Sequence, residues 1–331
     1  MKQFLQKKAK LVFLCMLVLL TCTACANPRG RDGKTLADQI IASEETTIDA
    51  SQINYKDISD KKLKKEIKKN IKDGQYTIQP TTFKDSMSKG WFEGLIVWPI
   101  AQIINLISSK TDAGVGIILT TLLIQMLVFV FTRKSQMSTQ RMQEISPEIQ
   151  KIQNKYKDKT DERSKMQMAQ EMQNLYQKYD IHPFGSMLIT FIQLPIMMGM
   201  YYATMRSVSV VSGSFMGISL AGTPLDGFKA LDIAYIAIYV LMVIFYIVSM
   251  KLPQWLKKWQ DKKDNVKVKK YAQEETNPMA NSMNMSMMYF MTAMICIMYI
   301  SWPMAMSFYW LVSSVIRVCQ SLILHQVMNK K

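Results

Sequence analysis

The sequence predicts an all-α membrane protein with five transmembrane helices, a cytosolic helical hairpin and an outer interfacial amphipathic helix. Apolar residues make up 49% of the 331-residue chain, and they are concentrated in blocks rather than spread evenly. The formal net charge is +16, and its Lys and Arg residues cluster on alternate sides of those blocks. Blocks of about 20 apolar residues are long enough to cross a bilayer.

The N-terminus has the pattern of a bacterial export signal. Basic residues precede the apolar run LVFLCMLVLL, so residues 1–24 are predicted to be a lipoprotein-type signal peptide. Ala24 and Cys25 resemble the end of a lipobox, although Cys22 stands where Leu is usual. We therefore predict lipidation at Cys25, which would anchor the chain in the outer leaflet. Ordinary signal-peptidase cleavage nearby, or an uncleaved anchor, is the alternative.

Residues 25–90 are polar and are predicted to be an extracellular linker. Within them, KKLKKEIKKNIK carries apolar residues at i, i+4 spacing, which favours either a short basic helix or a solvated segment. Residues 91–110 contain Glu93, Pro99, Gln102 and Asn105 between apolar positions. This segment is predicted to be an amphipathic helix in the outer interface rather than a sixth span.

Five spans are predicted, and the distribution of basic residues orients them. The spans cover residues 111–132, 182–206, 233–250, 283–300 and 303–324. Ten Lys and Arg lie in 133–181 and eight lie in Lys251–Lys270, whereas the loop 207–232 has only Lys229. Basic residues are enriched in cytoplasmic loops, so 133–181, the loop 251–282 and the tail 325–331 are placed in the cytosol.

Residues 133–181 are predicted to fold as two paired helices. Met142, Ile145, Ile149, Ile152 and Tyr156 follow a 3-4-3-4 spacing, and Met168, Met172, Leu175 and Tyr179 repeat it. Each helix therefore has one apolar seam, and the two seams can pack together. Ser146, Pro147 and Glu148 are expected to start a new helical turn, so the chain should break near Ser146.

Several spans contain polar residues, which suggests a hydrophilic recess. Polar groups in hydrocarbon usually face a bundle interior or a wet cavity. Ser and Thr alone could equally provide hydrogen bonds between helices. Arg317 differs, because it lies about 21 Å along its helix from the outer end. The candidate recess residues are Thr121, Gln125, Gln193, Tyr309, Trp310, Ser314 and Arg317.

Three stretches in order resemble the YidC/Oxa1/Alb3 family of membrane protein insertases, in its Gram-positive lipoprotein branch. They are MSTQRMQEISPEIQKIQNKY (Met137–Tyr156), HPFGSMLITFIQLPIMMGMYY (His182–Tyr202) and WPMAMSFYWLVSSVIRVCQ (Trp302–Gln320). The resemblance implies five helices around a hydrophilic groove that is open to the cytosol and to lipid. It further implies insertion of membrane proteins, alone or beside the Sec translocon, with no nucleotide or metal cofactor.

The resemblance also implies partners. These are nascent membrane proteins, the lipid bilayer, and the ribosome and Sec translocon, with nucleic-acid contact limited to ribosomal RNA. The protein would be a multi-pass protein of the bacterial cell membrane, with its N-terminus outside and its C-terminus in the cytosol. No bond is broken in insertion, so no enzyme activity is expected. A catalytic motif and a metal-ligand spacing are both absent from the sequence.

One position departs from the family pattern. Family members typically carry an arginine in the first span, in a motif like IRLILLP. Here the stretch is LLIQMLVFVF, so Gln125 stands where the arginine is expected and Val130 where the proline is expected. We hypothesise that Arg317 in the fifth span supplies the missing groove charge.

Two other classes of function fit parts of the sequence. A small-solute transporter would explain the polar spans and Arg317, but the chain shows no repeat between two halves, which many transporters have. An assembly scaffold that does not insert proteins would use the hairpin without the groove. Exposure of the groove to both sides of the membrane would indicate the transporter.

Overall fold

The computed structural model describes residues 28–157, 159, 161–181, 185–263, 290, 292–294 and 296–329. The predicted signal peptide, Cys25 and half of the predicted fourth span (283–300) lie outside these residues. The chain forms two compact units. The first contains the described residues up to Ile124, then Phe191–Met242 and Ile300–Ser313. The second contains Gln125–Thr190, Val243–Tyr299 and Ser314 onward.

Four helices are longer than the other elements. They are α5 (Ala113–Glu144), α8 (Gly185–Arg206), α11 (Ile233–Lys263) and α14 (Met304–Asn329). Three stretches are long and apolar enough to cross a membrane in the part that the structure describes, namely Ala113–Met142, Ile233–Gln260 and Met304–Val327. The protein is therefore a mostly helical membrane protein, and the count of five spans stays a prediction.

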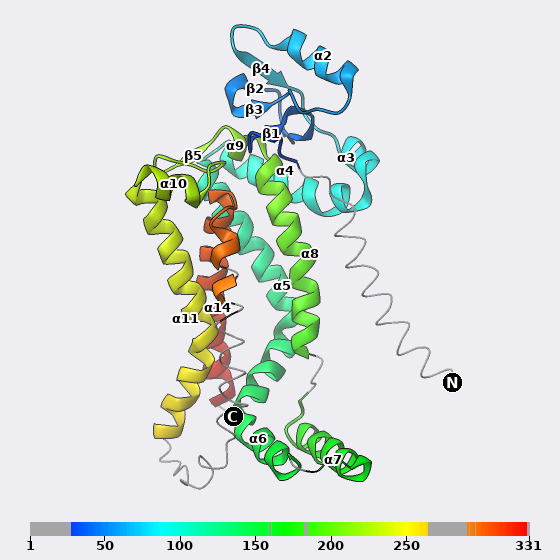
Figure 1. Ribbon diagram of the computed structural model, residues 1–331, viewed down its shortest axis with the longest axis vertical. Helices are drawn as coiled ribbons and strands as arrows, with labels where there is room; N and C mark the ends of the chain where they lie inside the picture. Colours follow the sequence, from blue (N-terminus) through cyan, green and yellow to red (C-terminus); the bar gives the residue numbers. More distant parts are fainter. Residues whose placement is uncertain are drawn as a thin grey trace, which may run out of the picture. The chain divides into compact units, whose positions relative to one another are not determined.

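The segment predicted to be a linker is folded instead. Strand β1 (Thr35–Leu36) pairs in parallel with β3 (Ile53–Asn54), and β2 (Thr46–Asp49) pairs antiparallel with β4 (Gln75–Ile78). The helices of this N-terminal domain are η1 (Ala37–Gln39), η2 (Ala50–Gln52), α2 (Lys61–Asn70) and α3 (Phe83–Lys89). In Figure 1 these elements lie together beside α4 (Trp98–Ser108) and α9 (Val208–Val211).

A small apolar core explains why this domain folds. Apart from the run Ile40–Ala42, most of its members are single apolar residues between polar ones, which is why the segment looks polar as a sequence. The buried residues include Ile40, Ile48, Ile53, Ile58, Ile67 and Ile78, together with Val208 and Val211 of α9. The domain therefore shares its core with the segment that follows α8.

The predicted interfacial helix is present, but its polar side faces the protein. It consists of a π-helical turn, η3 (Glu93–Val97), followed by α4. Glu93 and Asn105 are buried, whereas Leu95 and Leu106 are 57% and 58% exposed. Asn105 donates to the carbonyl of Ile41 and accepts from the Ser207 hydroxyl. The polar residues that gave the helix its amphipathic pattern thus bind the N-terminal domain and the end of α8.

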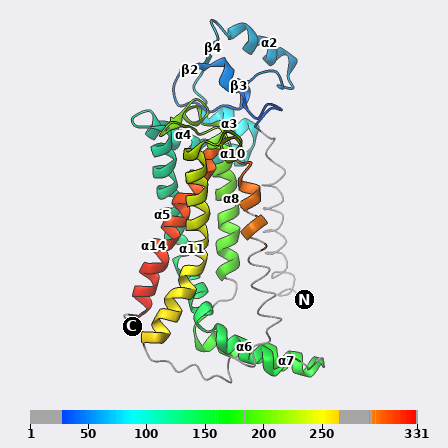
Figure 2. The same ribbon diagram turned by 60° about the vertical axis from the view of Figure 1, so that its left-hand side comes forward.

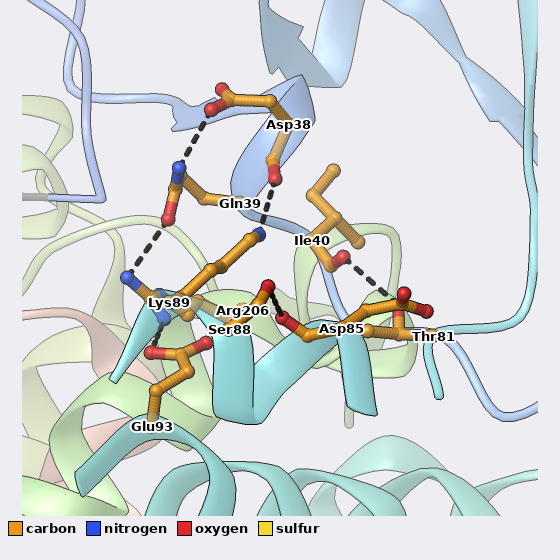
Figure 3. A network of polar contacts seen from close by, with 9 residues as sticks. All are labelled: Asp38, Gln39, Ile40, Thr81, Asp85, Ser88, Lys89, Glu93 and Arg206. Carbon is orange, nitrogen blue, oxygen red and sulfur yellow. Dashed lines mark hydrogen bonds and ion pairs between the residues drawn. The ribbon is translucent and has the colours of Figure 1, made fainter. Parts of the chain in front are cut away.

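A buried ion pair fixes this junction (Figure 3). Arg206, the last residue of α8, pairs with the Glu93 carboxylate, and their side chains are 4% and 8% exposed. Arg206 also donates to the Gln39 side chain at 2.9 Å. Nearby, burial and then the charge of Arg206 lower the pKa of Lys89, which donates to the Asp38 carbonyl. The network joins η1, η3 and α8.

The remaining elements are short connections and the hairpin. A two-stranded turn of β5 (Ser214–Phe215) and β6 (Ile218–Ser219) and helix α10 (Pro224–Ala230) link α9 to α11. Helices α6 (Ser146–Lys155) and α7 (Glu162–Lys178) form the hairpin. Helix α5 continues twelve residues past the predicted end of the first span at 132 and stops at Glu144. Ile145 then interrupts the helix, close to the break predicted near Ser146.

Removal of one partner of the buried pair should destabilise the first unit strongly. Glu93→Ala leaves the Arg206 charge buried without its carboxylate, which costs about 3–5 kcal/mol. Thermal unfolding in detergent measures this loss. The double variant Glu93→Leu, Arg206→Met should recover most of it, because two apolar residues replace two charges. Glu171→Ala, which breaks an exposed pair with Lys155, is the control and should cost under about 1 kcal/mol.

Candidate functional site

The seven predicted recess residues fall on three helices and divide between the two units. Thr121, Gln193, Tyr309 and Trp310 belong to the first unit, while Gln125, Ser314 and Arg317 belong to the second. In both groups, polar atoms lie near the middle of long apolar helices.

In the first unit, the structure brings α8 and α14 together through polar side chains. The Gln193 amide donates to the Tyr309 hydroxyl at 3.1 Å. Tyr309 is fully buried, and its ring lies edge-on to Trp310 at a centroid distance of 5.6 Å. Trp310 is also buried. A glutamine and two amphipathic aromatic rings therefore meet inside the helical part of this unit.

Pro195 adds further polarity near Gln193. It lies inside α8 and has no backbone N–H. The Phe191 carbonyl, one turn earlier, cannot receive the usual helical hydrogen bond from position 195. A side-chain amide and a main-chain carbonyl are thus both available for hydrogen bonding within two residues of each other.

Thr121 takes part less directly than predicted. Its side chain is buried, and its hydroxyl donates to the Ile117 carbonyl of the same helix at 2.7 Å. The hydroxyl proton of Thr121 is therefore used within the helix, and only the lone pairs of its oxygen could accept a hydrogen bond from another group. The hydroxyl of neighbouring Thr120 is buried and makes no hydrogen bond to the residues that the structure describes.

In the second unit, Arg317 folds back along its own helix. Its guanidinium donates to the Ser314 hydroxyl at 2.9 Å, and Ser314 is fully buried. The side chain thus points toward the N-terminal, apolar part of α14 rather than toward its C-terminal end. Arg317 lies about 20 Å, and Gln125 about 18 Å, from the first residue of its helix. Gln125 is buried at 5% exposure.

The sequence interpretation missed the Glu93–Arg206 pair. Glu93 was noted only as one of the polar residues of the segment 91–110, and Arg206 was only the last residue of the predicted span 182–206. Two opposite charges that border neighbouring apolar segments are a signal for pairing, because an unpaired charge there is costly. That signal could have indicated the buried network.

The hairpin seam is confirmed. Ile145, Leu175 and Ile181 are buried together, with Met142, Ile149, Ile152 and Tyr179 packed against them. Glu171 on α7 accepts from Lys155 at 2.5 Å and from the Tyr156 hydroxyl at 2.8 Å. These two hydrogen bonds lower the pKa of the Glu171 carboxyl. Across the hairpin, the Tyr179 hydroxyl donates to Glu148 at 2.6 Å.

The chemistry of these groups is that of hydrogen bonding. Among the described residues, no group of three His, Cys, Asp or Glu could hold a metal ion. The protein is a helical membrane protein whose long helices carry buried amide and hydroxyl groups and the partly buried guanidinium of Arg317, and it has a separate polar hairpin.

Comparison with known proteins gives the family. A sequence profile of the 60Kd inner membrane protein family matches residues 105–331. The chain belongs to this family, the YidC/Oxa1/Alb3 family of membrane protein insertases. Residues 1–104, which include the N-terminal domain, lie outside the match.

Relatives from Gram-positive bacteria agree with this. Membrane protein insertase YidC 1 of Streptococcus pyogenes is 31% identical over 238 residues, or 72% of this chain and 75% of the relative. YidC of Enterococcus faecalis is 30% identical, covering 72% and 76% of the two chains. MisCA of Bacillus subtilis is 26% identical, covering 72% and 80%.

The bond between Gln193 and Tyr309 should contribute measurably to stability. In a double-mutant cycle of Gln193→Leu and Tyr309→Phe, we expect a coupling free energy of about 0.6–1 kcal/mol, as found for hydrogen bonds between membrane helices. Unfolding in mixed detergent measures it. Tyr309→Phe combined with Thr204→Val should be additive, since Thr204 bonds the Tyr201 carbonyl. Additivity of the first pair would contradict the assignment.

The hairpin should depend on its seam rather than on its exposed methionines. Leu175→Ala removes a buried side chain, and we expect a cost of about 2–4 kcal/mol for hairpin folding. Limited proteolysis of the purified protein should then cleave within 146–178 at a faster rate. Met166 is 70% exposed, so Met166→Ala is the matched control. Equal cleavage rates of the two variants would be inconsistent with a packed seam.

Proposed function

We propose that this protein inserts integral membrane proteins into the bilayer and helps them fold. The observation that carries the proposal is the family match over residues 105–331, which contains all four long helices and the hairpin. The relatives over most of this length are named membrane protein insertases. This favours insertion over solute transport.

The proposed architecture has five helices around a hydrophilic groove open to the cytosol. The N-terminus lies outside, held by lipid on Cys25, and the C-terminus lies in the cytosol. The distribution of basic residues supports this orientation. The buried polar groups at mid-helix support the groove, because such groups are stable in a membrane only with a polar partner or water.

The proposed mechanism lowers a physical barrier. A polar segment of a substrate must cross an apolar layer about 30 Å thick. A hydrophilic recess would shorten that layer and replace part of the lost hydration, with polar groups such as Gln193 and Tyr309 of the first unit as hydrogen-bonding partners. The apolar part of the substrate would then move into lipid. No nucleophile or cofactor takes part.

Arg317 supplies the fixed charge of the groove in this proposal. Gln125 stands where members of the family typically carry an arginine. Its depth along α5 is similar to the depth of Arg317 along α14. The orientation of Arg317 toward Ser314 supports an inward role, since a guanidinium reaching for the cytosolic interface would point the other way. Both residues belong to the same compact unit.

The cytosolic hairpin would receive nascent chains, with the ribosome and the Sec translocon as partners. Its internal seam uses the apolar side of each helix, so the residues left at the surface are mostly charged or polar. Met166 and the lysines of α6 and α7 are the groups available to a partner. Methionine suits a surface that binds varied apolar segments.

A charge swap tests the role of Arg317. Arg317→Ser should lower insertion of a small substrate with an acidic translocated tail by about tenfold in proteoliposomes, because one charged hydrogen-bonding group is lost. The double variant Gln125→Arg, Arg317→Ser should restore it. Arg133→Ser makes the same change at an exposed position of α5 and serves as the control.

Two results would contradict the charge role. One is full activity of Arg317→Ser, which would show that the groove needs no arginine. The other is failure of the double variant while the protein remains folded, which would show that the charge cannot be supplied from α5.

A further inference from the structure

Helix α2 exposes a lysine surface on the N-terminal domain, outside the part of the chain that matches the family. The helix reads KKLKKEIKKN, with six lysines and one acid, Glu66. Ile67 is buried in the domain core and Leu63 packs against it. These two residues fix the orientation of the helix, and Lys61, Lys62, Lys65, Lys68 and Lys69 are left exposed.

Three of these lysines form one stripe. Lys61, Lys65 and Lys68 are spaced by four and three residues, which places them on one side of the helix. Within the part of the chain that the structure describes, no hydrogen bond or ion pair is found for their ammonium groups. The stripe is thus a row of unneutralised positive charges.

The stripe is unfavourable for the helix that carries it. Like charges at i, i+3 and i, i+4 destabilise a helix, and lysines in the first turn oppose the helix dipole. The Asp60 cap, which accepts from the Lys62 and Leu63 backbone amides, offsets part of this cost. A bound anion would offset the rest.

The stripe contains lysine and no arginine. A guanidinium recognises the planar geometry of a carboxylate through two parallel hydrogen bonds, whereas an ammonium acts as a point charge on a flexible stem. A lysine stripe therefore selects negative charge without selecting a particular sequence or geometry. This suits a set of varied acidic partners.

The domain holds the stripe in a fixed place relative to the end of α8. The Glu93–Arg206 pair, the Asn105 bond to Ile41 and the shared core with Val208 all fasten the domain to that end. Figures 1 and 2 show α2 on the side of the domain away from α4. If α2 only attached the domain to a membrane surface, this fixed junction with α8 would not be needed. Contact with a substrate that leaves the insertase does require a fixed position.

We propose that Lys61, Lys65 and Lys68 bind the acidic translocated segments of substrates on the outer side of the membrane. The inference rests on the proposed insertase function and orientation. Translocated segments are poor in Lys and Arg, so Asp and Glu dominate their charge. Because salt screens charges beyond about 8 Å, the stripe acts only on a segment that has already crossed. It retains the segment and opposes its return.

The test uses the full-length protein in proteoliposomes and two model substrates. The substrates differ only in their translocated tails, one rich in Asp and the other with Asn at the same positions. The triple variant Lys61→Gln, Lys65→Gln, Lys68→Gln should lower insertion of the Asp-tail substrate about fivefold, as expected for three exposed ion pairs. Insertion of the Asn-tail substrate should be unchanged, which separates this proposal from the insertase function itself.

Matched variants control for charge and folding. Lys56, Lys84 and Lys110 are exposed but lie off α2, so their replacement by Gln loses the same charge and should leave both substrates unaffected. Replacement of the stripe by three arginines should preserve insertion of the Asp-tail substrate. A photocrosslinker at position 65 should label the Asp tail during insertion and the Asn tail much less.

Three outcomes would overturn the proposal. The first is an equal change for both substrates, and the second is equal labelling of both tails. The third is a loss of Asp-tail insertion by the triple variant in phosphatidylglycerol vesicles but not in phosphatidylcholine vesicles. That result would show that the lysines bind anionic headgroups. The effect should instead persist in phosphatidylcholine.

Discussion

A polar side chain inside an apolar layer must find a partner within the protein or in trapped water, and this constraint governs both parts of the molecule. At the end of α8, Arg206 satisfies it with Glu93 and Gln39. Along α8 and α14, Gln193 and Tyr309 satisfy it with each other. In α14, Arg317 turns to Ser314. The first arrangement is almost completely buried. The others place amide, hydroxyl and guanidinium groups on long apolar helices, where a polar segment of a substrate could form hydrogen bonds with them.

The N-terminal domain depends on the same constraint. It is fastened by a buried ion pair whose desolvation cost is repaid only when both partners are present. Such a junction fixes geometry more than it adds stability. The domain therefore behaves as a rigid extension of the first unit, and its lysine helix has a defined position. Family membership rests on residues 105–331, so this domain is a feature of the chain that the family match does not explain.

The sequence predicted the helical features well where periodicity was strong. The seam from Met142 to Ile152 and its partner around Leu175 pack as their spacing indicated. The N-terminal domain was missed because most of its core residues, such as Ile48 and Ile53, stand singly between polar residues and form no long periodic pattern. The polar side of 93–105 was recognised, but its partner was not, since Arg206 is 113 positions away from Glu93. The polar residues within the spans were selected because a polar side chain is energetically costly in lipid. The sequence alone could not show that Gln193 bonds Tyr309, since this contact depends on how α8 and α14 pack.

In the proposed mechanism, water reaches the polar residues of the long helices from the cytosol alone. Cysteine accessibility measures this. Single cysteines at 193, 309 and 317, in a chain with Cys296 and Cys319 replaced, would be exposed to a membrane-impermeant thiol reagent from each side of the membrane. We expect the reagent to modify these cysteines from the cytosolic side alone. Modification from the outer side, or from neither side, would contradict it.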